Sequence, residues 1–196
     1  GIRHLRMSRG LGDVYKRQLC AQREGPTGVN AVNDFCEDFV KSAFKVPSAD
    51  DMYNGKVIIV RQNDSGLGVA NGDVAIIFGL KTADSDKPTW YAFIGDLKKI
   101  VPAQLLPKYD TAFAITIHQS QGSGFRDVAI FLPTLSAGSD AASLCTRELL
   151  YTGITRSEKT CQIFGAKDVL GMSLKTVTQR SGGLPQRLKE RFSEQG

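Results

Sequence analysis

Hydrophobic and polar residues follow two kinds of pattern along the chain. Over residues 29–44 the apolar positions recur at steps of three and four, which predicts an amphipathic helix that ends before Pro47. Short β-branched runs predict four strands at residues 56–60, 73–78, 89–94 and 98–101. Because these strands are closely spaced and separated by Gly-rich turns, we expect a small antiparallel sheet or barrel between about residues 52 and 107.

The segments on either side of this β region have the alternation of an α/β fold. Strands are expected at residues 19–22, 112–117, 127–132 and 160–164, and a helix is expected at residues 146–154. Strands that alternate with helices form a mostly parallel sheet. We therefore expect one α/β unit made of residues 19–50 and 108–175, interrupted by a β insertion at 51–107 and followed by a polar, loosely attached tail at 176–196.

The formal net charge of +5 is concentrated at the amino-terminal end. Residues 1–18 carry +4 of it, so the rest of the chain is nearly neutral and its charge does not indicate a nucleic-acid partner. Residues 1–18 also lack regular periodicity and the apolar stretch of a secretory signal. They resemble a translated adaptor or assembly scar, the alternative being a natural basic arm that binds nucleic acid. We exclude them from the fold and expect the natural protein to continue upstream.

The four cysteines do not predict a metal site. They are scattered singly through the chain, without a CxxC pair, and the histidines are His4 and His118 alone. Single cysteines in apolar surroundings fit reduced thiols, which predicts a cytoplasmic location. No apolar run approaches the roughly 20 residues that span a bilayer, so we expect no membrane partner.

Three segments carry possible chemistry, and each has an ordinary structural explanation. Residues 116–125 (TIHQSQGSGF) follow a strand and offer amides and hydroxyls to phosphate oxygens, although Gly and Ser also make ordinary turns. Residues 147–156 place Arg156 at a helix end, either as an arginine finger for a phosphoryl group or as a solvated residue favoured by the helix dipole. Residues 63–73 contain Asn-Gly, which by default is a hairpin turn.

Together with LCAQREGPTGV at residues 19–29, these segments resemble, in order and spacing, the C-terminal part of RecD-like superfamily 1 DNA helicases. TIHQSQG resembles helicase motif V, ELLYTGITR resembles motif VI, and the resemblance extends from residue 19 to about 192. It implies the second RecA-like motor domain, of P-loop NTPase type, of an ATP-dependent 5′→3′ helicase that acts in DNA double-strand break repair and recombination. The β insertion would be its small accessory barrel.

The resemblance also implies roles for individual residues. Arg156 would be the arginine finger, and Gln121, Gly122, Thr155 and, less directly, Arg23 would lie at the ATP phosphates. Single-stranded DNA would be contacted by Thr116, His118 and Asn63. The usual motif V acid near the nucleotide sugar is replaced here by Gly124, which puts that contact in doubt. After Arg156 the usual arginine-rich continuation reads Ser-Glu-Lys.

The chain lacks the elements that hold ATP and Mg²⁺ in such motors. It contains no GxxxxGK[ST] sequence and no acidic pair at the end of an apolar strand. We therefore expect half of a motor, with its Mg²⁺ ligands on an N-terminal motor domain, and no hydrolysis by the chain alone. Further expected partners are single-stranded DNA and the RecB and RecC subunits, if it works in that complex rather than alone. The alternative is a stand-alone nucleic-acid-binding or docking module, which the upstream reading frame would distinguish.

Overall fold

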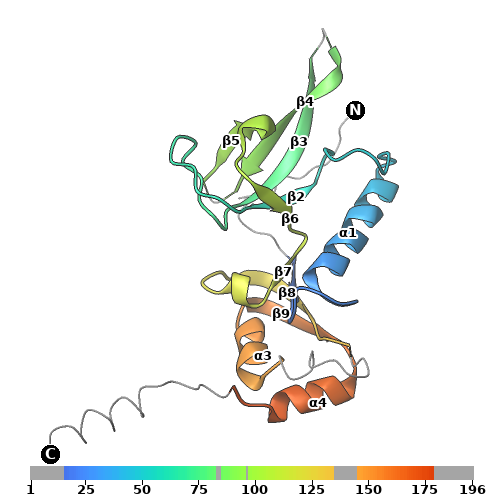
Figure 1. Cartoon of the computed structure of the whole chain (residues 1–196), viewed down its shortest axis with the longest axis vertical. Coiled ribbons are helices and arrows are strands. Elements are labelled where there is room, and N and C mark those ends of the chain that lie inside the picture. The colour runs from blue at the N-terminus through green and yellow to red at the C-terminus, as the bar shows by residue number, and fades with distance from the viewer. Residues whose placement is uncertain (1–15, 83–84, 96, 135–144, 179–196) are drawn as a thin grey trace, which may run out of the picture.

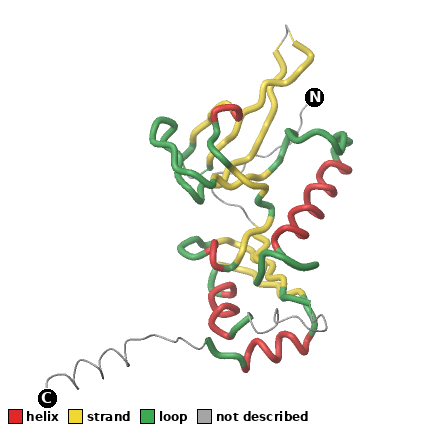
Figure 2. Tube along the Cα trace, viewed as in Figure 1, coloured by secondary structure: helices red, strands yellow, loops and turns green. Residues whose placement is uncertain are grey.

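The computed structural model describes residues 16–82, 85–95, 97–134 and 145–178, which form a parallel α/β layer and an antiparallel β part (Figures 1 and 2). The α/β layer contains β1 (Lys16–Cys20), α1 (Val29–Ala43), β7 (Ala114–Thr116), the 3₁₀ turn η2 (His118–Ser120), β8 (Phe125–Phe131), α3 (Arg147–Ile154), β9 (Ser157–Phe164) and α4 (Lys167–Lys175). The β part contains β2 (Val57–Val60), β3 (Val74–Thr82), β4 (Ser85–Ile94), β5 (Lys99–Pro102), η1 (Ala103–Leu105) and β6 (Tyr109–Thr111).

The sheet of the α/β layer is parallel throughout. Its strand order is β7-β1-β8-β9, and each neighbouring pair runs in the same direction. This confirms the predicted α/β class with an all-β insertion. Because the strands are parallel, Thr116, Cys20 and Phe131 pair at the carboxyl edge of the sheet, while Phe125 and Ser157 pair at the opposite, amino edge. The candidate functional residues of the α/β layer lie at these two edges.

Strand β1 begins earlier than predicted. The expected strand at residues 19–22 was wrong at both ends, because Arg17 and Gln18 already pair with β8 and the strand ends at Cys20. The Arg17 side chain is 2% exposed, and its Nε and Nη2 have no hydrogen-bond partner. Burial lowers the pKa of Arg17 to about 10, and the guanidinium lies 5.8 Å from the centre of the Phe125 ring. Because the charged Arg17 occupies a buried position of β1, the apolar pattern of the sequence did not reveal where this strand begins. Residues 1–15 of the excluded segment lie outside the described residues.

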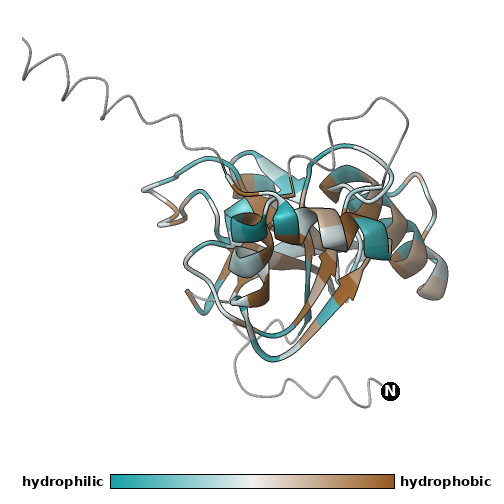
Figure 3. Cartoon of the chain, turned by 90° about the horizontal axis from the view of Figure 1, so that it is seen from below, coloured by the Kyte–Doolittle hydropathy of each residue, from teal (hydrophilic) through white to brown (hydrophobic). Residues whose placement is uncertain are grey.

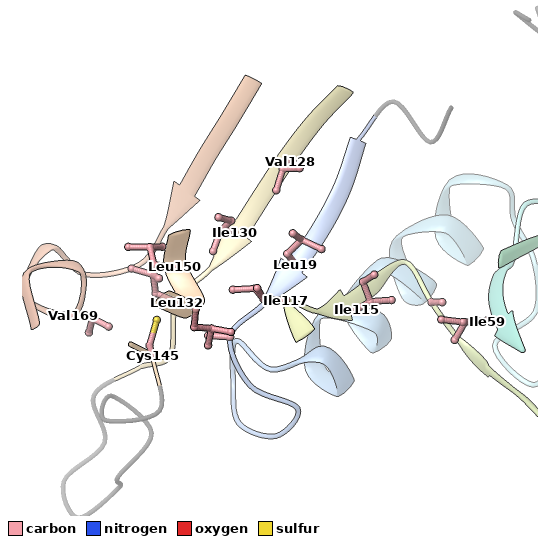
Figure 4. Packing of buried hydrophobic residues seen from close by; sticks show 13 residues of the cluster. Leu19, Ile59, Ile115, Ile117, Val128, Ile130, Leu132, Cys145, Leu150 and Val169 are labelled. Carbon is pink, nitrogen blue, oxygen red and sulfur yellow. The ribbon is translucent and has the colours of Figure 1, made fainter. Parts of the chain in front are cut away.

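One apolar cluster fills the space between the parallel sheet and helices α3 and α4. Figure 4 shows Leu19, Val128 and Ile130 on neighbouring strands, with Leu150 and Val169 contributed by the helices; all five are buried. Helix α3 begins where predicted, because the Thr146 side chain accepts a hydrogen bond from the amide of Leu149 at 3.3 Å. The sequence did not predict α4, which buries only Val169 and Ser173 and so has a short apolar pattern.

Helix α1 covers the other face of the sheet beside β7 and β1. Val29 and Val32 pack there with Cys20 and Ala114, as the predicted amphipathic pattern requires. Figure 3, seen from below, shows hydrophilic and hydrophobic residues alternating along the helices. The apolar face of α1 is only partly used, however, since Phe35 and Phe39 are 71% and 67% exposed.

The β part is a five-stranded antiparallel sheet with its own core. Its strand order is β5-β4-β3-β2-β6. Ile58, Ile77 and Ile94 are fully buried in it. The last strand, β6, pairs with β2, so the pairing of this sheet continues to Thr111, past the predicted limit at residue 107.

A polar seam joins α1 to the β part. The buried Asn33 side chain accepts a hydrogen bond from the Ala114 amide (2.8 Å) and donates to the carbonyls of Thr111 (3.1 Å) and Ala114 (3.3 Å). Nearby, the buried Lys56 ammonium donates to Asp51 Oδ1 at 2.6 Å and lies 3.8 Å from Glu37 of α1. Buried polar groups that are fully paired in this way fix the relative position of packed elements.

Two predictions from the sequence concern the state of the cysteines and the presence of membrane-spanning helices. Cys20, Cys36, Cys145 and Cys161 are free thiols, and burial raises the pKa of Cys20 to about 12. Within the described ranges, no helix has both the length and the apolar character needed to cross a membrane.

Candidate functional site

The site begins at the carboxyl end of β7, where Thr116 closes a tight turn. The amide and hydroxyl of Thr116 donate to Oε1 of Gln119 (3.0 and 3.2 Å), and the Gln119 amide donates back to Thr116 Oγ1 (3.1 Å). The turn continues as η2, which presents His118 to solvent. The sequence analysis did not single out Gln119, although a polar side chain three residues after Thr is typical of such a turn.

The segment from Gln121 to Gly124, here called the motif V loop, then runs to the amino edge of the sheet. All four residues are exposed. Gly122 has a φ of +88°, a left-handed conformation that favours glycine, and a Cβ there would meet no atom within 4 Å. The loop ends at Phe125, whose amide donates to the Arg156 carbonyl at 2.8 Å. The amides of Gln121 and Ser123 donate to the carbonyls of His118 (3.2 Å) and Ser120 (3.1 Å), so within the loop the amides of Gly122 and Gly124 are the ones that suit an anion.

Arg156 lies at the same amino edge, between the end of α3 and the start of β9. Its Nε donates to the Thr152 carbonyl (3.2 Å), Nη1 to the Ser123 carbonyl (3.2 Å) and Nη2 to Thr155 Oγ1 (3.4 Å). The guanidinium therefore connects the helix end to the motif V loop. All three acceptors are neutral oxygens, so the positive charge of Arg156 is positioned by these bonds but not neutralised by them.

Thr155 orients this arginine and is itself held by the helix. Its hydroxyl donates to the Thr152 carbonyl at 3.0 Å while accepting from Arg156. The Thr152 hydroxyl in turn donates to the Glu148 carbonyl at 2.8 Å. The structure thus brings Arg156 and Thr155 to the motif V loop that contains Gln121 and Gly122, while the roles of these four residues stay predictions.

Arg23 lies elsewhere, in the loop that follows β1 at the carboxyl edge. Its Nη2 is 3.5 Å from Asp110 Oδ2, and Arg61 donates to the same oxygen at 2.6 Å. These three side chains border a cavity of about 230 Å³ beside α1. Arg23 and Arg156 therefore do not share one phosphate site in this chain. In a parallel sheet, a residue that follows one strand and a residue that precedes another lie at opposite edges. The predicted strand positions, with Arg23 after residues 19–22 and Arg156 before residues 160–164, already contained that signal.

Asn63, the predicted DNA contact in the β part, lies in the loop between β2 and β3. Its Oδ1 accepts a hydrogen bond from the Asn71 amide at 2.7 Å, which closes the loop. The side chain is exposed, and the loop is further held by the pairing of Asp64 with Val69. Its structural role is clear from these contacts, while its contact with DNA stays a prediction.

Helix α3 is fixed at its amino end as well as at Arg156. Glu148 Oε2 accepts hydrogen bonds from the amide and hydroxyl of Thr178, both at 2.9 Å. These bonds hold the pKa of Glu148 down at about 2. The expected loose attachment of the tail is therefore wrong for residues 176–178, and residues 179–196 lie outside the described residues.

The described residues include no group of three or more His, Cys, Asp or Glu side chains that would hold a metal ion. The arrangement at the amino edge is instead suited to an anionic ligand. It combines a guanidinium that Thr155 helps to position with the backbone of the exposed residues Gly122 and Gly124. A phosphate would add an anionic acceptor to this charged donor, and Arg–phosphate pairs, which are frequently bidentate, are among the strong hydrogen-bonded pairs in proteins.

Comparison with known proteins places this site in a helicase domain. Residues 111–163, from the end of β6 to β9, match the family described as UvrD-like helicase C-terminal domain. The chain is 34% identical over 173 residues to the RecBCD enzyme subunit RecD of Mycolicibacterium smegmatis, and 32% identical over 177 residues to that of Mycobacterium tuberculosis. Each match covers 88% of this chain, but the chain spans only 29% and 28% of the length of these relatives.

The fold comparison agrees. A crystal structure of Pif1 helicase from Bacteroides in complex with ADP-AlF₃ and ssDNA matches 92% of this chain and 46% of its own, with a TM-score of 0.50 at 15% identity. This likeness shows the RecA-like fold of the α/β layer. Together, the matches show that residues 111–163 are similar to a UvrD-like helicase C-terminal domain and that most of the chain is similar to part of RecD.

Proposed function

We propose that the chain is the C-terminal motor half of an ATP-dependent 5′→3′ DNA helicase of the RecD type, acting in double-strand break repair and recombination. The observation that carries this proposal is the position of Arg156. Its guanidinium is held at the amino edge of the sheet by neutral oxygens alone and is already attached to the motif V loop. It is therefore free to stabilise negative charge that develops on a transferred phosphoryl group.

In this proposal Arg156 acts on a nucleotide that is bound mainly by another motor domain. Gln121 contributes its exposed side chain and Gly122 its backbone amide, and Thr155 keeps the guanidinium oriented. ATP and Mg²⁺ are the expected cofactors, with the Mg²⁺ ligands outside this chain. The reaction is phosphoryl transfer to water, in which positioning and neutralisation of charge supply most of the rate enhancement.

In this proposal the motif V loop links the residues that contact DNA to Arg156, which contacts the nucleotide. Thr116 and His118, the proposed contacts with the single-stranded backbone, come just before the motif V loop, and the Ser123 carbonyl in that loop accepts a hydrogen bond from Arg156. A phosphate that draws Arg156 away from this carbonyl would release the loop. Backbone contacts of this kind hold the track without reading its sequence. RecB and RecC subunits are proposed partners, because the relatives are named as subunits of RecBCD.

The test is the rate of DNA-stimulated ATP hydrolysis by the intact helicase that carries this region. Arg156→Ala should lower the rate by about 10³–10⁵ while the thermal midpoint stays unchanged, because loss of an arginine finger has an effect of that size. Arg147→Ala is the matched control: this arginine begins helix α3, is exposed, and among the described residues its side chain pairs with its neighbour Glu148 at 3.5 Å. A folded Arg156→Ala protein with the wild-type rate would contradict the proposal.

A further inference from the structure

The outer face of helix α1 carries two exposed aromatic rings, Phe35 and Phe39, here called the aromatic stripe. The two residues are four positions apart and therefore lie next to each other on the helix surface. They are 71% and 67% exposed, and neither belongs to a core cluster of the described residues. Figure 1 shows α1 along one side of the molecule. Single exposed apolar residues are common, but adjacent rings on one helix form a patch that suits a partner.

The stripe is presented on a helix whose inner side is already fixed. Val29 and Val32 pack against the parallel sheet, and the Asn33 side chain accepts a hydrogen bond from the Ala114 amide at 2.8 Å. Nothing in the helix itself requires aromatic residues on the outer face, since phenylalanine has a lower helix propensity than the long polar residues. A surface that is rigid before binding loses little conformational entropy when a partner docks.

The charges around the stripe are negative. Asp34 and Asp38 form the neighbouring row of the helix and are exposed, and no ion pair within the described part of the chain includes either of them. The one basic residue of α1, Lys41, has a side chain that is only 13% exposed. Its ammonium already binds Glu37 at 3.3 Å and the Ser48 carbonyl at 3.0 Å. The outer face of α1 is therefore apolar and acidic.

This chemistry restricts the partner. Nucleic acids and anionic lipids are repelled by carboxylates. A second copy that used the same face would bring Asp34 and Asp38 against their own equivalents, and like charges across an interface are costly. A protein surface that combines apolar residues with lysine or arginine is complementary to both the rings and the carboxylates.

The small size of the stripe favours a partner that is covalently connected. A separate protein needs an interface of about 800 Å² on each side, whereas a linked domain is held at a high effective concentration and needs less. The RecD relatives contain such additional chain, because this chain spans only 29% and 28% of their length. We propose that the aromatic stripe is the docking surface for another part of the same polypeptide in the intact helicase, a part whose surface is apolar and basic. This inference rests on the proposed function, which makes the chain one half of a longer motor.

The first experiment compares hydroxyl-radical labelling of single phenylalanines in this chain and in the intact helicase. Phe35 and Phe39 should be labelled several-fold more slowly in the intact helicase, without DNA and at every protein concentration, because the docked part excludes water. Phe44, which is 70% exposed at the end of α1, is the matched control and should be labelled alike in both. Equal labelling of the stripe in the two proteins would overturn the inference. Protection that requires high protein concentration would assign the stripe to a second copy, which also overturns it.

A second experiment tests the chemistry of the surface through thermal midpoints. Phe35→Ser combined with Phe39→Ser should leave the midpoint of this chain nearly unchanged, because serine and phenylalanine have similar helix propensities, and should lower that of the intact helicase. Asp38→Lys should also lower only the latter, whereas Asp50→Lys, at an exposed position outside the helix, should lower neither. Equal shifts in both proteins would contradict docking. A wild-type rate in Arg156→Ala would instead overturn the proposed function, and neither labelling nor midpoints depend on that rate.

Discussion

The two edges of the parallel sheet both carry arginine, but they use it differently. At the carboxyl edge Arg23 and Arg61 converge on one carboxylate, Asp110, which neutralises charge and ties the β1–α1 loop to the β part. At the amino edge Arg156 donates to two carbonyls and a hydroxyl, which fix its direction and leave its charge uncompensated. The partner of an arginine, more than its exposure, indicates whether the charge is structural or available to a ligand.

The sharpest test of this difference exchanges each arginine for lysine in the intact helicase. Arg156→Lys keeps the charge but loses the planar fork that reaches Ser123 and Thr155 together, so most of the expected factor of about 10³–10⁵ in turnover should be lost. Arg23→Lys should hydrolyse ATP at the wild-type rate, because Arg61 still holds Asp110 at 2.6 Å.

The readout is DNA-stimulated ATPase activity, with the thermal midpoint measured alongside to show that both variants are folded. An equally large loss in Arg23→Lys would contradict the comparison. It would restore the phosphate-sensing role that the family resemblance assigned to Arg23.

The next effect concerns the seam beside the carboxyl edge. Asn33→Ala should lower the free energy of unfolding by about 3 kcal/mol, because it leaves the Ala114 amide and two carbonyls without partners at about 1 kcal/mol or more each. Asn30→Ala is the matched control. This residue is exposed on the same helix and bonds only to the exposed Glu24.

Urea unfolding of both variants measures the difference. Equal midpoints for the two would show that the seam does not depend on Asn33. The position of the β part would then have to be attributed to Lys56, Asp51 and Glu37.

Most of the fold was accessible from the sequence because its strands follow simple rules. The alternation of Val128 and Ile130 with less buried neighbours predicts β8, and the three- and four-residue apolar spacing with Thr146 before it predicts α3. These apolar spacings identify the buried face of a single strand or helix. They failed where burial was incomplete, as for the exposed Phe35 and Phe39, or where a charge was buried, as for Arg17.

The candidate site was accessible only in part. Segment order places the motif V loop and Arg156 in one domain, and the structure brings them into contact. Gln119 and Ser123 were missed because one acts through a turn and the other through its main-chain carbonyl.

Arg17 extends the comparison to the interior, where a fourth arginine has neither carboxylate nor carbonyl partner for Nε and Nη2. Arg17→Leu should raise the free energy of unfolding by about 1–4 kcal/mol, the range in which apolar residues improve on buried ionic groups. Lys16→Leu, at the exposed neighbouring position, should give no gain. A loss of stability in Arg17→Leu, measured by urea unfolding, would mean that its stacking on Phe125 outweighs the cost of burial.

The smallest expected effect is a pH dependence at the beginning of α3. Glu148 Oε2 accepts from neutral donors, the amide and hydroxyl of Thr178, while its Oε1 lies 3.5 Å from Arg147. Its pKa is about 2 in the folded chain against an ordinary value of 4.5, so the ionised form is favoured by folding. The stabilisation is therefore complete above about pH 4.5 and is lost as the pH falls toward 2. Thermal midpoints of wild type and Glu148→Gln should differ at pH 6 and converge in acid. A difference that stays constant with pH would show that Thr178 does not prefer the Glu148 carboxylate over the side-chain amide of glutamine. The effect is small because Glu148 faces solvent, where water and salt weaken such bonds.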